Sequence, residues 1–126
     1  MSSTVKANKW LHSDGTETTE VDVPSLDQRM AKAWVTFDEV NNVIRDSYNV
    51  SSLTDVDNNN MKVNLAITMS NVHYAIAATA AQRTSNPADH TVTGIPLSTT
   101  QFQLEVYNTV TAVVIDDYVS AIVFGS

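Results

Sequence analysis

Asp55, Asp57 and Asn59 are spaced like the first oxygen ligands of a calcium-binding loop. An EF-hand also needs a Gly at its sixth position and a Glu at its twelfth, and here those positions hold Asn60 and Ala66. Asp and Asn bond to their own backbone and favour turns. We therefore interpret residues 55–60 as the solvated tip of a β-hairpin rather than as a metal site.

The neighbouring carboxylates Asp116 and Asp117 could in principle form an acid/base pair. In an extended chain, however, adjacent side chains point to opposite faces, so the two groups could not act on one substrate. Charges that end an apolar run more often mark the end or edge of a strand. We expect no catalysis at this pair.

The remaining side chains show no catalytic or cofactor-binding pattern. The histidines (His12, His73 and His90) belong to different predicted elements without the short spacing of metal ligands, and the chain has no cysteine. Three glycines cannot supply a phosphate-binding loop, and the Gly-x-Ser-x-Gly nucleophile motif is absent. The sequence therefore predicts no enzyme, no metal and no cofactor.

Three aromatic residues, Trp34, Tyr48 and Tyr107, could bind a sugar by stacking and hydrogen bonding. The alternative is that they pack in the core or in a subunit interface, as aromatic side chains commonly do. The sequence leaves both interpretations open.

Charge and length limit the class of protein. The chain has 126 residues, with seven Lys and Arg against fourteen Asp and Glu, which gives a formal charge of −7. This balance argues against binding to nucleic acid or to an anionic membrane surface. We expect one domain, no signal peptide after Met1 and no membrane insertion, because no apolar stretch approaches the ~20 residues of a spanning helix.

Strict alternation of apolar and polar residues predicts a half-buried strand at residues 61–68, which forms the second arm of a long hairpin from Ile44 to Met69. Further strands are predicted at residues 32–37, 73–81, 99–107, 110–115 and 118–124. Residues 73–81 and 118–124 have no polar face, which predicts cover on both sides, by the sandwich or by another subunit. Residues 82–97 are predicted to form a long loop, because they contain Pro87, Gly94 and Pro96.

The first 30 residues form a separate N-terminal arm in this interpretation. Asp14 and Gly15 connect two strand-like runs, which predicts a hairpin, and Ser25 and Gln28 form a capping box for one helical turn. The apolar residues of the hairpin are Trp10, Leu11, Val21 and Val23. The hairpin is either a solvated flap or an arm that pairs with a neighbouring subunit.

Six or seven body strands separated by regular turn signals favour an antiparallel β-sandwich of jelly-roll or immunoglobulin-like type in residues 31–126. No repeat is visible. The predicted class is therefore all-β, with the arm in residues 1–30.

Four blocks of the sequence resemble a β domain of virion proteins from tailed bacteriophages, often found at the C-terminus of tail fibres in marine and cyanobacterial phages. The blocks are AKAWVTF at 31–37, IRDSYNVSS at 44–52, MSNVHYA at 69–75 and the closing Asp-x-x-Val-x-x-Ile-Val-Phe-Gly at 116–125. The family usually has glycine in the turns at 38–42 and 57–60. Here asparagine takes those places, and it can adopt the same left-handed conformation.

The resemblance implies a structural protein of the virion, made in the host cytoplasm and assembled as a homotrimer in a tail fibre or tail tip. The expected interface residues are the arm residues Trp10, Leu11, Val21 and Val23 together with Ala75, Ala77 and Ala81. The loop residues Asn86, Asp89 and His90 are expected to face a host-surface glycan or an adjoining virion protein. A head decoration protein and a carbohydrate-binding module are the alternative functions.

Overall fold

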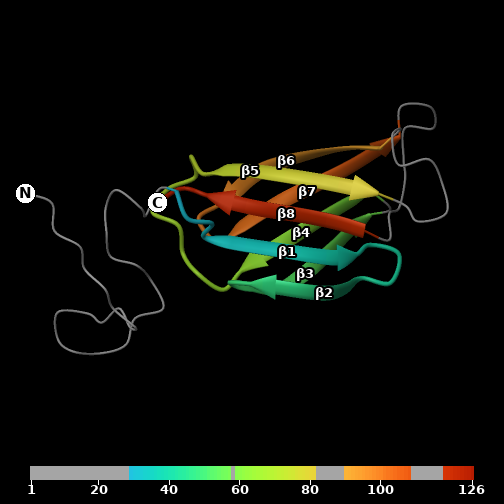
Figure 1. Cartoon of the computed structure of the whole chain (residues 1–126), viewed down its shortest axis with the longest axis horizontal. Helices are drawn as coiled ribbons and strands as arrows, with labels where there is room; N and C mark the ends of the chain where they lie inside the picture. Colours follow the sequence, from blue (N-terminus) through green and yellow to red (C-terminus); the bar gives the residue numbers. More distant parts are fainter. Residues whose placement is uncertain (1–28, 58, 82–89, 109–117) are drawn as a thin grey trace, which may run out of the picture.

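The computed structural model describes residues 29–57, 59–81, 90–108 and 118–126, which form eight antiparallel strands in two four-stranded sheets (Figure 1). The first sheet has the order β2-β1-β8-β5 and the second β3-β4-β7-β6. The strands are β1 (Ala33–Asp38), β2 (Val43–Tyr48), β3 (Val50–Asp57), β4 (Asn60–Leu65), β5 (Ala75–Ala81), β6 (His90–Ser98), β7 (Gln101–Asn108) and β8 (Tyr118–Phe124). The predicted all-β sandwich is confirmed, with eight strands in place of six or seven.

Alternating burial on the central strands explains why the two sheets pack face to face. On β1, β4, β7 and β8 every second side chain is buried, as expected for strands with one face in the core. The largest fully buried side chains include Phe37 on β1 and Phe102 on β7. Burying one such side chain contributes about 1.5–3 kcal/mol, so the central strands supply most of the packing energy.

The chain passes from the first sheet to the second at Asn49. Its φ of 56° lies in the left-handed region that Asn tolerates. Its side-chain amide donates to the carbonyl of Lys32 at 2.8 Å, and its own carbonyl accepts from the Ala66 amide at 2.9 Å. The prediction of one long hairpin from Ile44 to Met69 is therefore wrong, because this corner places β2 and β3 in different sheets.

The second half of that predicted hairpin is confirmed. β3 and β4 pair in antiparallel register, with Met61, Val63 and Leu65 buried. The Asn59 amide donates to Asp57 Oδ1 at 3.2 Å, and the Asn59 carbonyl accepts from the Val106 amide at 2.9 Å. These bonds fix the turn against β7.

Residues 90–98 form strand β6, so the prediction of a loop throughout residues 82–97 is wrong for its second half. Proline is compatible with β6 because the strand lies at the edge of its sheet and Pro96 precedes a register shift. Gly94 is required by packing, since a Cβ there would lie 2.8 Å from Ile76 Cγ2 on β5. Residues 82–89 lie outside the described part of the chain.

Residues 75–81 form a strand rather than a helix, as predicted. Ile76, Ala78 and Ala80 pack against the core cluster, whereas Ala75 and Ala77 are exposed on the other face. The sandwich therefore covers only one side of β5. Cover of the other side by another subunit stays a prediction.

Tyr74, just before β5, connects the two sheets. Its buried hydroxyl lies 2.9 Å from the carbonyl of Ser98 and 2.8 Å from that of Gln101, at the β6–β7 turn. Burial raises the pKa of the Tyr74 phenol, so the hydroxyl keeps its proton and can donate it to these carbonyls.

Candidate interaction surface

The outer face of the first sheet has a row of apolar side chains that crosses all four strands. The strand register places Tyr48, Trp34, Ile122 and Ala77 next to one another in that order. We call these four residues the aromatic row. Tyr48 is 40% exposed and Ile122 is 41% exposed, although Ile122 lies on a central strand. Large apolar side chains that form a contiguous exposed group commonly mark an interaction site.

A polar row lies beside the aromatic row on the same face. It consists of Asp46, Thr36, Ser120 and Thr79, again one residue from each strand. Thr36 Oγ1 and Ser120 Oγ are hydrogen bonded at 3.0 Å. The face therefore combines an aromatic platform with a line of hydroxyl groups and one carboxylate.

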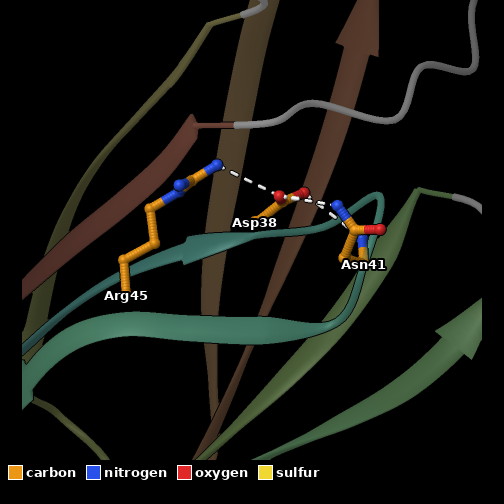
Figure 2. A network of polar contacts seen from close by, with 3 residues as sticks. All are labelled: Asp38, Asn41 and Arg45. Atoms are coloured by element: carbon orange, nitrogen blue, oxygen red, sulfur yellow. Dashed lines mark hydrogen bonds and ion pairs between the residues drawn. The ribbon is translucent and has the colours of Figure 1, made fainter.

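An ion pair holds the end of this face, where β1 turns into β2 (Figure 2). Asp38 Oδ2 accepts from Asn41 Nδ2 at 2.9 Å and from Arg45 Nη2 at 3.0 Å, and Asp38 Oδ1 accepts from the Asn41 amide at 3.2 Å. The hydrogen bond from the Asn41 side chain is the main cause that lowers the pKa of Asp38, and the Arg45 charge acts in the same direction. Burial of the carboxyl group opposes them.

Arg45 also joins β2 to β8 at this end of the sheet. Its Cζ lies 4.5 Å from the centroid of the Tyr118 ring, within the range of a cation–π contact. The guanidinium thus contacts Asp38 on one side and an aromatic ring on the other. Because Asp38 and Arg45 bind each other, we interpret this ion pair as one that stabilises the fold.

On β4 and β7 the outer face of the second sheet is largely polar, whereas Ile95 on the edge strand β6, opposite Gln103, is an apolar side chain that is 54% exposed. Gln101 Nε2 donates to Asn64 Oδ1 at 2.7 Å, and Gln103 Nε2 donates to Asn60 Oδ1 at 3.2 Å. Asn64 Nδ2 in turn donates to the hydroxyls of Ser52 and Thr54, both at 3.0 Å. We call the four amide side chains (Asn60, Asn64, Gln101 and Gln103) the amide ladder. Because these amides bond to one another, this face needs no partner to satisfy them.

The three aromatic residues considered for sugar binding do not form one site. Trp34 and Tyr48 are directly opposite each other on the first sheet, whereas Tyr107 lies on β7 of the second sheet. The Tyr107 hydroxyl bonds to the carboxylate of Glu105, and this bond raises the pKa of the phenol. A stacking platform could therefore include the first two residues without Tyr107.

Only part of the predicted interface and loop residues lies in the described structure. Ala75, Ala77 and Ala81 share the outer side of β5, as predicted, and Ala75 and Ala77 are exposed. His90 is the first residue of β6 instead of a loop residue. The predicted residues outside the described part of the chain are Trp10, Leu11, Val21, Val23, Asn86 and Asp89.

The sequence did not identify Ile122 as part of this surface. Residues 118–124 lack a clearly polar face, which indicated that apolar side chains lie on both sides of this strand. Alternation alone does not tell which of these apolar residues point outward. The register of β8 between β1 and β5 provides that information.

Within residues 29–57, 59–81, 90–108 and 118–126, no group of three or more His, Cys, Asp or Glu side chains could hold a metal ion. Over the same residues, the search for a helix with the length and apolar character of a membrane span finds none. Comparisons with protein-family models, with curated proteins and with solved structures find no match.

Proposed function

We propose that this chain is a structural subunit of a bacteriophage virion, in a tail fibre or tail tip, where it takes part in particle assembly and host adsorption. The observation that carries the proposal is the aromatic row on the first sheet, in which Tyr48, Ile122 and Ala77 are exposed and Trp34 is half-buried. Such a row would gain free energy by being covered in an assembly. The assignment to a phage rests on the resemblance of the four sequence blocks.

The three of those blocks that lie wholly within the described residues fall on positions that build the first sheet and its connections. Residues 31–37 contain β1, residues 44–52 contain most of β2 and the Asn49 corner, and residues 69–75 lead through Tyr74 into β5. The resemblance thus follows the elements that present the exposed face. This agreement supports an assembly role.

Self-association is the form of assembly that we propose, with the trimer expected from the sequence as a prediction. The protein would act mechanically, by joining subunits, and no catalytic step is assigned to it. A head decoration protein would use the same surface to bind capsid subunits.

Carbohydrate binding is a second candidate function, favoured by the direct pairing of Trp34 with Tyr48 beside the polar row. An isolated monomer that binds glycans, and that loses this binding when Trp34 is replaced by alanine, would support it. Replacement of Tyr107, which lies on the other sheet, is the matched control.

Immunogold electron microscopy of purified phage particles that encode this chain tests the proposed function. Antibodies against the purified protein should label the tail fibres or the tail tip. Label on the head would assign the chain to decoration of the capsid. A role in the virion would be contradicted if the particles remain unlabelled and the antibody also detects no band in a blot of the denatured particle proteins.

A further inference from the structure

Four strands lie at the edges of the two sheets: β2 and β5 in the first, β3 and β6 in the second. An edge strand presents unpaired backbone N–H and C=O groups, and proteins usually protect such edges with charges, proline, bulges or short strands. A comparison of the four edges therefore indicates where another strand could be added.

Three of the edges have such protection. β2 carries Arg45 and Asp46 and lies beside a register shift between Thr36 and Phe37. β3 carries Asp55 and Asp57 and has register shifts at both ends. β6 contains Pro96, which has no N–H to donate, followed by a further shift.

β5 has no comparable protection among the described residues. Its sequence AIAATAA contains no charge and no proline. It pairs with β8 over all seven residues, from Ala75 with Phe124 to Ala81 with Tyr118, without a register shift. A regular, uncharged strand of this length at an edge is suited to pair with another strand.

We propose that β5 pairs in antiparallel fashion with β5 of a second copy of this chain, about a two-fold axis at Ala78. This inference deepens the proposed function and rests on it, because it names the seam between subunits. The first sheet of one copy and the first sheet of the other would then form one continuous eight-stranded sheet. This arrangement would place two copies of the aromatic row on one face.

The sequence of β5 makes a second copy the fitting occupant. With Ala78 opposite its own copy, Ala77 lies opposite Thr79, Ile76 opposite Ala80, and Ala75 opposite Ala81. Each larger side chain therefore meets alanine, and no charge lies opposite another. Since each chain has a formal charge of −7, two copies repel each other wherever charged surfaces meet, and an uncharged seam avoids this cost.

A two-fold axis also gives a different stoichiometry from the predicted trimer. Pairing of identical strands about a dyad is self-complementary and closes after two copies. The inference therefore predicts a dimer, or an even-numbered assembly built from it.

Disulfide cross-linking tests the seam and its register, and the natural chain has no cysteine to interfere. In the proposed register the Ala77 position of one copy lies opposite the Thr79 position of the other. The Cα atoms of opposite residues are ~4.5–5.5 Å apart, within the span of a disulfide, whereas diagonal neighbours are ~7–8 Å apart. Ala77 and Thr79 are both exposed on the outer face, so cysteine there leaves the core unchanged.

Full-length A77C and T79C chains, one of them with a size tag, are oxidised separately and as a mixture. The mixture should give about tenfold more cross-linked dimer than either variant alone, and most of it should contain one tagged and one untagged chain. Equal cross-linking in all three samples, or none in any, would overturn the proposed register.

A charge exchange tests the same seam without a covalent bond. The double variant A77E/T79E places two like-charged pairs across the dyad, as does A77K/T79K, and each should raise the dimer dissociation constant about tenfold or more. A mixture of the two variants should restore the dimer. An oligomer that both variants leave intact would overturn the β5 seam while the proposed function stands, because labelling of the particle decides that function independently.

Discussion

Asp38 is a single residue whose charge state couples the fold to pH. Its pKa is lowered in the folded protein, mainly by the Asn41 side chain, so the carboxylate stabilises the fold at pH values above its unfolded pKa. That contribution is lost as the pH falls through the lower, folded pKa. Acid should therefore weaken the contacts of Asp38 with Asn41 and Arg45, which hold the β1–β2 turn.

We expect D38N to be less stable than the wild type at neutral pH and to approach it as the pH falls below about 4. The asparagine has no charge to pair with Arg45 and cannot be protonated in this range. Urea unfolding at pH 7, 5 and 3 measures the difference. N41A, which removes the main cause of the lowered pKa, should shift the acid-dependent loss of stability to higher pH. A difference between D38N and the wild type that stays constant at all three pH values would contradict this account.

Gly94 is a second residue with a specific physical requirement, the close approach of β6 to β5. A Cβ at this position would lie 2.8 Å from Ile76 Cγ2 and 3.4 Å from Leu104 Cδ2. We expect G94A to lower the free energy of unfolding by about 1–3 kcal/mol, as overpacking commonly does.

The double variant G94A/I76A serves as the control, because it removes the methyl group that the new Cβ would meet. The loss of unfolding free energy in the double variant should be smaller than the sum of the losses in G94A and I76A, as measured in a double-mutant cycle by chemical denaturation. Additive effects of the two substitutions would mean that β5 and β6 do not contact each other at this point.

At the scale of elements, substitutions in β5 can test which side of this strand faces the core. Ala78 packs against the core cluster, whereas its neighbour Ala77 is exposed. A78D would place a carboxylate at the packed position without a partner and should cost about 1–3 kcal/mol. A77D should change stability by less than about 0.5 kcal/mol.

Thermal unfolding at one low protein concentration measures both variants of β5. Equal melting temperatures for A78D and A77D would mean that Ala78 is no better packed against the core than Ala77. A larger loss in A77D than in A78D would mean that the strand is turned by one residue relative to the structure.

Several elements could be predicted from sequence because alternation directly records one buried and one solvated face. This holds for β1, for β4 and for the inward residues of β7, all of which contribute to the core. Strand β6 could not be predicted, since Gly94 and Pro96 are usual loop residues and only an edge position with a close neighbour makes them suitable for a strand.

The sheet switch at Asn49 was missed for a different reason. The residues on both sides of it favour strand, and one asparagine with φ of 56° is sufficient to redirect the chain. The same property of asparagine was anticipated at the β1–β2 turn, where Asn42 has φ of 53°. For the interaction surface, the sequence predicted Ala75, Ala77 and Ala81, whereas the aromatic row could be recognised only from the register of four strands.

At the scale of the whole molecule, the two outer faces of the sandwich differ in the side chains that they present. The amide ladder of the second sheet is bonded within itself, and Ile95 at the β6 edge of that sheet is exposed. The first sheet exposes Tyr48 and Ile122 in one row and ends at β5, an edge that has no charge, proline or register shift among the described residues. Assembly through the first sheet would cover the aromatic row and leave the amide ladder in water. The aromatic row and the β5 edge together are the physical basis of the proposed subunit role.

The mass of the full-length protein in solution, measured by light scattering over a range of concentrations, tests the claim of self-association most directly. We predict a dimer, or a larger even-numbered assembly, that dissociates on dilution. A trimer would support self-association but contradict the two-fold seam at β5. A monomer at the highest concentration would contradict self-association through the first sheet.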